Sequence, residues 1–386
     1  MNKRRITKII IFVLVFLLVV SLVVFLYNLK NKNIVMERNI ESYREYSNSI
    51  IPNENGFIVV GSSDHNSYKI EKASISQYDF DRNKILEKVY NKGYNSSFYD
   101  VIQDNEFYVA VGSYESTKKE LKNKTRTAFI VKYDKDFNIV FENDFQVVGD
   151  SNYYNIIKVL DGYVVCGDGV NSINKNGEIG ATLIKYDFNG NEIFRKYIGS
   201  IGARYNGLLY LDNYIYACGV DGDKAFITKY DLYGNVIQVA HYENCEFTSI
   251  VNIDDRLYVS GIINKGNLTN GVVVSYDSFL NKVNEVIYNK YDNNKFNKLL
   301  VDKDSIIVIG DMYYKDTINL SDGIIGKYTK DLAEKSVIRY NGNRNIIFKD
   351  ALFIDDKYIV IGHYNDNDTI ISKIFVFSSS LKSLGA

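Results

Sequence analysis

The chain of 386 residues is poor in the residues that mark several protein classes: one proline, three cysteines, three histidines and no tryptophan. So few cysteines exclude a small disulfide-framed domain, and 26 glycines are far below the one-third content of collagen. Aromatic residues make up 14 % of the chain, which excludes a disordered protein. The composition therefore describes a folded protein.

Charge is distributed unevenly along the chain. The net charge is −1, but residues 1–32 hold six basic and no acidic residues, so the remainder has 46 − 6 = 40 basic against 47 acidic residues. Nucleic acid binding depends on basic patches, and a mildly acidic body does not favour it. We therefore expect no nucleic acid partner.

A long apolar run lies near the N-terminus. Residues 9–27 are all apolar except Ser21, and at about 1.5 Å per residue they reach about 28 Å, close to the thickness of a bilayer core. The alternative is a cleaved secretory signal, whose apolar region is usually about 7 to 15 residues long and is followed by small residues. No such cleavage site follows here, because the first alanine of the chain is Ala73. The run therefore predicts an uncleaved transmembrane helix.

The basic residues around this run predict its orientation. Lys3, Arg4, Arg5 and Lys8 precede it and outnumber the basic residues that follow at once, so positive-inside bias places the N-terminus in the cytoplasm. The sequence thus predicts a single-pass cell-membrane protein whose body is extracytoplasmic. The expected segments are a cytoplasmic basic tail at 1–8, the transmembrane helix at 9–27 and a linker at 28–33.

After the linker, one pattern of residues recurs seven times. Each copy contains an apolar run that ends in glycine, and the seven glycines are Gly61, Gly112, Gly167, Gly219, Gly261, Gly310 and Gly362. A polar loop and a second apolar run follow, which in five copies ends in Tyr-Asp, at Tyr78, Tyr133, Tyr186, Tyr230 and Tyr276. The sixth copy has Tyr328 before a threonine, and the seventh retains neither residue of the pair.

Each copy predicts four short strands. Val, Ile, Tyr and Phe fill the apolar runs, and Asp, Asn and Gly fill the turns between them, as in the hairpin signal at residues 187–191. Units of four strands repeated four to eight times at about 40 to 50 residues are typical of β-propellers. The sequence therefore predicts an all-β, seven-bladed β-propeller of four-stranded blades over residues 34–377, followed by a C-terminal tail at 378–386.

The two ends of the repeat region complement each other. The seventh copy ends with the segment 369–377 and lacks a fourth strand, whereas residues 34–41 stand before the first inner strand in the place that 139–145 take in the second copy. We expect residues 34–41 to form the outer strand of the last blade and to close the ring. The short linker then enters on the face with the hairpins between strands 1 and 2 and between strands 3 and 4. That face is expected to look toward the membrane, and the opposite face outward.

The repeat resembles that of a known family. The third copy carries the resemblance best, with Tyr-Val-Val-Cys-Gly at 163–167 and Leu-Ile-Lys-Tyr-Asp-Phe-Asn-Gly-Asn at 183–191. It resembles the seven-bladed β-propeller repeat of bacterial secreted and surface proteins over about residues 34–377, although Phe194 stands where that family often has tryptophan. The resemblance implies the fold and an extracytoplasmic setting, and it implies no single activity.

Histidines and acidic residues suggest one candidate chemical site. His65 and His363 fall at the start of outward loops in the first and last blades, which become neighbours when the ring closes, and Asp64 and Asp311 lie nearby on that face. A metal or acid–base site is conceivable there, but two solvated loop histidines are the alternative, and no paired-histidine spacing supports the site. Neither a metal nor a cofactor is predicted.

Two other residue patterns invite a chemical interpretation that the sequence does not support. The turns at 187–191 and 231–235 resemble calcium loops but lack the carboxylates that calcium needs, so hairpins are expected there. Cys166 and Cys218 occupy equivalent positions before glycine and are expected to be small apolar core residues.

Tyrosine in the outward loops suggests a binding surface. Tyr114, Tyr313, Tyr314 and Tyr364 lie in or beside these loops among charged residues, and tyrosine can bury a ring while keeping a polar tip. Ordinary loop residues are the alternative interpretation. The full set of candidate ligand-binding residues is Asp64, His65, Tyr114, Asp311, Tyr313, Tyr314, His363 and Tyr364.

No catalytic motif occurs in the sequence. We therefore expect a membrane-anchored extracytoplasmic binding or scaffold module for a protein or a cell-envelope glycan. A surface polysaccharide hydrolase or lyase that uses the axial funnel is the alternative, and it would require convergence of inner-strand residues such as Asp100, Asn155, Asn206 and Thr248. A sensor or assembly partner whose anchor docks with other membrane proteins is a third hypothesis.

Overall fold

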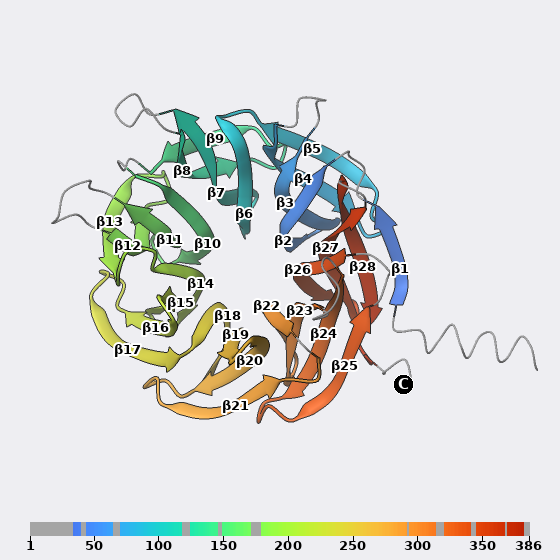
Figure 1. Ribbon diagram of the computed structural model, residues 1–386. Helices are drawn as coiled ribbons and strands as arrows, with labels where there is room; N and C mark the ends of the chain where they lie inside the picture. Colours follow the sequence, from blue (N-terminus) through green and yellow to red (C-terminus); the bar gives the residue numbers. More distant parts are fainter. Residues whose placement is uncertain are drawn as a thin grey trace, which may run out of the picture.

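The computed structural model describes residues 34–39, 44–64, 70–117, 124–145, 149–170, 179–291, 293–313, 320–340, 345–366 and 369–381. These residues form seven antiparallel sheets of four strands each, arranged around a common axis (Figure 1). The seven-bladed β-propeller predicted from the repeat is therefore confirmed. The predicted tail, transmembrane helix and linker at 1–33 lie outside the described residues. No helix in the described ranges is both long and apolar enough to cross a bilayer.

The first four blades follow the chain in order. Their strands, from the axis outward, are β2 (Glu45–Asn53), β3 (Gly56–Ser63), β4 (Lys72–Asp79) and β5 (Lys84–Tyr90) in the first blade; β6 (Tyr94–Asp104), β7 (Phe107–Thr117), β8 (Lys124–Tyr133) and β9 (Ile139–Asp144) in the second; β10 (Ser151–Val159), β11 (Gly162–Val170), β12 (Ile179–Tyr186) and β13 (Glu192–Ile198) in the third; and β14 (Arg204–Leu211), β15 (Tyr214–Asp221), β16 (Lys224–Tyr230) and β17 (Val236–Glu243) in the fourth.

The last three blades continue this order, except that the outermost strand of the seventh comes from the start of the chain. Their strands are β18 (Cys245–Ile253), β19 (Arg256–Lys265), β20 (Leu268–Tyr276) and β21 (Lys282–Tyr288) in the fifth blade; β22 (Asn293–Asp302), β23 (Ser305–Tyr313), β24 (Ser321–Thr329) and β25 (Glu334–Tyr340) in the sixth; and β26 (Asn345–Ile354), β27 (Lys357–Asp366), β28 (Thr369–Ser378) and β1 (Ile34–Asn39) in the seventh.

The ring is closed by the pairing of β1 with β28. The two strands run antiparallel, with Arg38 opposite Ile374 and Glu37 opposite Phe375, and β1 lies on the outer edge of the last blade (Figure 1). The leading segment thus has the position expected from the sequence, and its strand ends at Asn39. β28 is the third strand of this blade, and β1 as the fourth covers the edge that β28 would otherwise expose.

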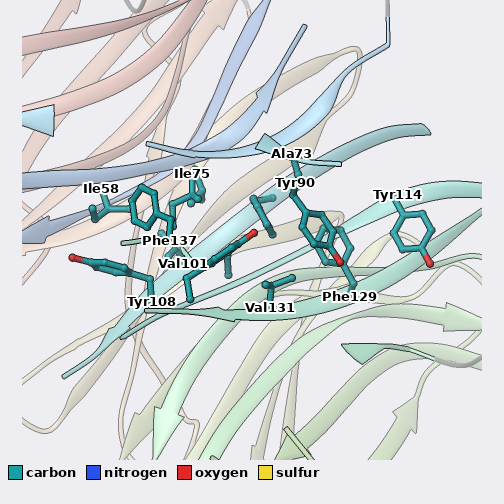
Figure 2. Packing of buried hydrophobic residues seen from close by; sticks show 14 residues of the cluster. Ile58, Ala73, Ile75, Tyr90, Val101, Tyr108, Tyr114, Phe129, Val131 and Phe137 are labelled. Atoms are coloured by element: carbon teal, nitrogen blue, oxygen red, sulfur yellow. The ribbon is translucent and has the colours of Figure 1, made fainter. Parts of the chain in front are cut away.

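The core consists of apolar side chains packed between neighbouring blades. Figure 2 shows the cluster between the first and second blades, where Ile58 and Ile75 of one sheet meet Val101 and Val131 of the next. In six blades the inner strand adds a fully or almost fully buried ring at one equivalent position, namely Phe98, Tyr153, Tyr205, Phe247, Phe296 and Phe348. The first blade has Ser47 there instead, which is buried and whose hydroxyl has no hydrogen-bond partner among the described residues.

The turns between strands 3 and 4 use the Asp-Asn spacing of the repeat. Asp187 Oδ1 accepts hydrogen bonds from the backbone N–H groups of Asn189 and Asn191, each at 2.8 Å, and Oδ2 accepts from the Asn191 side chain at 2.8 Å. Asp231 makes the same contacts with Asn235. These carboxylates are engaged by their own turns, so the hairpin interpretation of both segments is confirmed.

The lysine that precedes the repeated tyrosine links neighbouring blades. Lys132 Nζ donates to Tyr163 Oη of the next blade at 2.8 Å and lies 3.4 Å from Asp104, which also accepts from Tyr163 at 2.5 Å. Lys327, Asp302 and Tyr358 form the equivalent group between the sixth and seventh blades. This repeated residue thus stabilises the stacking of blades on the hairpin face.

Candidate binding site at the axis of the ring

All seven inner strands are irregular at the same place, next to the repeated glycine. The residue before the irregularity lies opposite that glycine, as Phe98 does opposite Gly112. A Cβ atom added at Gly112 would lie 1.9 Å from the carbonyl oxygen of Ser97, so only glycine permits this close approach. The seven residues within these bulges are Asn48, Tyr99, Tyr154, Asn206, Thr248, Asn297 and Lys349.

The residue after each bulge contributes to a ring of residues around the axis. Its members are Ser49, Asp100, Asn155, Gly207, Ser249, Lys298 and Asp350. Four of them accept a hydrogen bond from a backbone N–H group of the following blade. The donors are Ile156 to Asp100 at 3.0 Å, Leu208 to Asn155 at 2.9 Å, Leu299 to Ser249 at 3.2 Å and Ile50 to Asp350 at 3.2 Å. This ring holds neighbouring blades together at the axis.

One hydroxyl group lies between two carboxyl groups in this ring. Ser49 Oγ is 2.8 Å from Asp100 Oδ1 and 3.0 Å from Asp350 Oδ2. A hydroxyl group has a single hydrogen, so both contacts are hydrogen bonds only when one carboxyl group carries a proton. Burial raises the pKa of Asp100, and the Asp350 charge adds to this effect, while Lys298 opposes it. A proton on Asp100 would let both contacts of the Ser49 hydroxyl be hydrogen bonds.

Five of the ring residues line a small polar cavity, namely Asp100, Asn155, Gly207, Ser249 and Lys298. Its volume is about 180 Å³, and Asp100, Asn155, Asn206 and Thr248, which were expected to converge at the axis, all line it together with Lys298 and Lys349. Ligand pockets for drug-sized molecules are usually about 300 to 1,000 Å³. The axial cavity can therefore accept only a small group of a larger ligand.

The carboxyl group of Asp100 is already engaged on both oxygens. Oδ1 contacts Ser49, and Oδ2 accepts from Asn155 Nδ2 at 2.6 Å and from the backbone of Ile156. A raised pKa in a cavity is typical of general acids, but these contacts direct the group toward neighbouring blades. The geometry therefore gives Asp100 a role in holding the ring together.

A larger cavity lies beside the axis, on the face with the loops between strands 2 and 3. Its volume is about 570 Å³, and its lining residues are Glu115, Thr125, Arg126, Asp150, Asn152, Asp168, Gly169, Gly180, Ile201, Gly202 and Ala203. Tyr99 and Tyr154, whose rings are 5.6 Å apart, line the axial cavity and connect the two. Tyr99 Oη accepts from Arg126 at 3.1 Å, and Tyr154 Oη donates to Asp168 at 2.9 Å.

Of the predicted ligand-binding residues, three lie in one neighbourhood beside Asn297 and Lys349, which line the axial cavity. Asp311 is fully buried, accepts a hydrogen bond from Asn297 at 2.7 Å and lies 3.6 Å from Lys295 Nζ. The same lysine lies 5.6 Å from the ring centre of Tyr313, which is half-buried. His363 is buried, with its ring 5.5 Å from that of Tyr46 in the first blade.

Asp64 does not belong to this group, and two further predicted residues lie outside the part of the chain that the structure describes. Asp64 is buried, and its backbone N–H donates to the carbonyl oxygen of Arg44 at 2.8 Å. His65 and Tyr314 lie outside the described residues, so the predicted pairing of His65 with His363 stays a prediction. Among the described residues, no three His, Cys, Asp or Glu side chains are close enough together to hold a metal ion.

Two of the predicted tyrosines are buried, although exposed loop positions were expected for them. Tyr114 packs against Phe129 in the core between the first and second blades (Figure 2) and donates to Asp144, and Tyr364 packs between the sixth and seventh blades. The expectation was wrong because strand side chains alternate between the two faces of a sheet. Both residues stand two positions after the repeated glycine and face the preceding blade. His363 stands one position after it, so its side chain lies on the opposite face of the sheet.

The sequence interpretation missed the lysines beside the cavity mouth. Lys349 lines the axial cavity, and within the described ranges it forms neither an ion pair nor a hydrogen bond. Burial lowers the pKa of Lys349, and the neighbouring Lys295 lowers it further, while Asp311 opposes both. Burial also lowers the pKa of His363 to about 3, with Lys349 and Lys295 adding to this effect. Lys349 is the bulge residue of the seventh blade, and Lys295 stands opposite Asp311 two residues before the bulge of the sixth. The repeat pattern alone does not show where the inner strands bulge.

Comparison with known proteins gives no family. No protein-family model and no curated protein matches the chain. Among solved structures, the AfRom2 CNH domain is similar at 10 % identity and a TM-score of 0.49, over 89 % of this chain and 98 % of that one. A Trypanosoma rangeli sialidase in complex with sialic acid is similar at 11 % identity and a TM-score of 0.43, over 90 % of this chain and 57 % of that one. Similarity at this level says nothing of activity or ligand.

Proposed function

We propose that this chain is a membrane-anchored, extracytoplasmic propeller that binds a cell-envelope glycan at the face opposite its hairpins. The observation that carries the proposal is a cavity of about 570 Å³ on that face, together with a polar cavity of about 180 Å³ at the axis. The larger one falls within the usual size of pockets for small ligands.

Binding is a better explanation of the axial residues than catalysis. A glycosidase of the usual kind needs two carboxyl groups free to act as acid and as base or nucleophile. Here Asp100 and Asp350 share the Ser49 hydroxyl and accept backbone N–H groups of neighbouring blades. These contacts support a structural role for both groups.

The lining of the larger cavity suits a ligand with many hydroxyl groups. Arg126, Asn152 and Asp168 present guanidinium, amide and carboxylate groups on a concave surface. Protein interfaces instead rely on aromatic anchors in a broad patch that excludes water. A glycan is therefore the ligand that these residues favour, and a protein partner is an alternative outcome of the binding test.

The anchor and the orientation rest on the sequence. The apolar run at 9–27 and its preceding basic residues support a membrane helix with a cytoplasmic N-terminus. In intact cells, a membrane-impermeant amine reagent is expected to modify exposed lysines such as Lys135, while a cytoplasmic marker protein stays unmodified. Modification only after lysis would contradict this orientation.

Glycan binding can be tested with the full chain in detergent, immobilised and exposed to purified envelope polysaccharides. Ile201 lines the larger cavity and is 79 % exposed, so Ile201→Ser should weaken retention about tenfold without unfolding the protein. Tyr233→Ser is the matched control, because Tyr233 is 80 % exposed and lies in a hairpin turn on the other face. Retention that both variants weaken equally, or capture of proteins only, would contradict the proposal.

A further inference from the structure

Three nitrogen-bearing side chains lie in one neighbourhood between the sixth, seventh and first blades, and one of them, Lys349, lines the axial cavity. Lys295 comes from β22, Lys349 from β26 and His363 from β27. The charges of both lysines act on His363, and each lysine acts on Asp311, which places the four groups in one neighbourhood. The rings of Tyr46 and Tyr313 flank the group.

The hydrogen bonds of this group are incomplete. His363 is only 9 % exposed, yet its Nδ1 atom has no hydrogen-bond partner among the described residues. Buried polar atoms are nearly always paired, so this nitrogen, when it carries the proton, can donate to a bound molecule. The Oδ2 atom of Asp311 accepts no hydrogen bond from the described residues either, and Lys295 Nζ at 3.6 Å balances its charge.

One lysine of this neighbourhood has no carboxyl partner of its own. Lys295 pairs with Asp311 at 3.6 Å, and Lys298 pairs with Asp350 at 3.5 Å and also interacts with the charge of Asp100. Lys349 lines the axial cavity and forms neither an ion pair nor a hydrogen bond within the described ranges. Its ammonium group is therefore the one in this neighbourhood that is open to an added anion.

We propose that Lys349, Lys295 and His363 form a subsite for an oxyanion, the carboxylate or phosphate group of an acidic glycan. Lysines act as point charges and suit either group, and no arginine fork is present among the three to select a planar carboxylate. The cavity of about 180 Å³ admits one such group and excludes a bulky ligand. The source of the oxyanion rests on the proposed function, whereas its binding can be tested separately.

The experiment uses the full chain in detergent with three small probes of matched size: glucuronate, glucose 6-phosphate and glucose. At least one anionic probe should raise the melting temperature and bind in calorimetry, and glucose should do neither. Lys349→Gln should weaken binding of the anion at least tenfold, and Lys349→Arg should retain most of it. Lys349→Gln removes no hydrogen bond or ion pair of the described residues, so the variant is expected to fold.

Lys135→Gln is the control, because it removes the same charge from an exposed turn on the hairpin face. It should bind like the unmodified chain. Binding of glucuronate alone identifies a carboxylate, and binding of glucose 6-phosphate alone identifies a phosphate. No anion binding, or binding that Lys349→Gln leaves unchanged, would overturn the subsite. The proposed function would survive that result if polysaccharides still bind in an Ile201-dependent way.

Discussion

The backbone N–H of Ile50 in the first blade donates a hydrogen bond to the side chain of Asp350 in the last blade, at 3.2 Å. Three hundred residues of sequence separate the two, and the contact joins the ends of the ring at the axis. At the outer edge of the last blade, β1 and β28 join the same ends a second time. The ring is thus closed on both its inner and its outer circumference.

Asp350→Ala tests the inner closure. Asp350 is 2 % exposed and accepts hydrogen bonds from Ser49 and from the backbone N–H groups of Ile50 and Ala351. It also lies 3.5 Å from Lys298, so its loss removes a partner of two N–H groups and of one ammonium group. We expect the free energy of unfolding to fall by about 2 to 4 kcal/mol in urea titrations. Asp255→Ala, at an exposed turn, should change it by less than about 0.5 kcal/mol. Equal effects of the two substitutions would mean that the axial contact does not stabilise closure.

Removal of β1 tests the outer closure. A chain that begins at residue 42 should melt at a lower temperature than one that begins at residue 34, because β28 then has a free edge. The expected loss is roughly 3 kcal/mol, from about 1 kcal/mol or less for each backbone hydrogen bond. A peptide of residues 34–41, added in excess, should restore part of the melting temperature. Identical melting of the two chains would show that this pairing contributes nothing.

Lys132 and Lys327 each link two neighbouring blades, and the two linkages provide a matched comparison. Asp104 contacts Lys132 and also Lys158, at 2.5 Å, whereas Asp302 has Lys327 as its one cationic partner among the described residues. Burial alone would raise the pKa of Asp104, but hydrogen bonds from Lys158 and Tyr163 lower it, so this carboxylate stays ionised. Lys327→Met should therefore cost about 1 to 2 kcal/mol more than Lys132→Met in urea titrations. A larger loss for Lys132→Met would contradict this assignment.

The number of blades and the order of strands could be predicted because they depend on features that recur. Glycines such as Gly112 and tyrosines such as Tyr186 mark the same two strands in successive blades, and β-branched residues between them have strong strand propensity. The closing strand was predictable for a related reason, since a last copy without a fourth strand leaves an edge that must be covered. These signals are local or periodic, so one sequence is enough to show them.

The candidate site was only partly predictable. Asp100 and Asn155 were expected at the axis because inner strands converge there, and both line the axial cavity. Lys349 was missed because its position depends on a bulge, and a bulge changes which face each later side chain takes without a clear mark in sequence. Tyr114 was placed in an exposed loop because the strand extends further beyond its glycine than the apolar run does.

The buried imidazole of His363 predicts a dependence of stability on pH. Its pKa is about 3 in the folded protein, because of burial and of the charges of Lys349 and Lys295, against 6.5 in an unfolded chain. Below about pH 6.5 the unfolded chain binds a proton that the folded protein does not, so the free energy of unfolding should fall as the pH decreases toward about 3. Urea titrations between about pH 7 and pH 5 should show a shallower fall for His363→Gln.

The comparison of the unmodified chain with His363→Gln isolates the contribution of this histidine to the pH dependence of stability. Carboxyl groups whose pKa is raised by burial, such as Asp168, have the opposite effect on pH dependence, but both proteins contain them. A separate measurement is the imidazole resonance of His363, which should keep its neutral chemical shift well below pH 6.5. An ordinary titration near pH 6.5 would show that the ring is solvated in solution.

The repeated glycine predicts the most damaging small substitution in the inner sheets. A methyl group at Gly112 would meet the Ser97 carbonyl oxygen at 1.9 Å and the Phe98 Cα at 2.9 Å, and both belong to backbone that cannot move without breaking the bulge. Gly112→Ala should therefore lower the free energy of unfolding by more than about 3 kcal/mol, or prevent folding. Gly222 is the control, because a methyl group there meets nothing within 4 Å and its φ of +62° alone opposes alanine. Gly222→Ala should cost only about 1 kcal/mol, and a similar cost for Gly112→Ala would mean that the inner strand yields easily at the bulge.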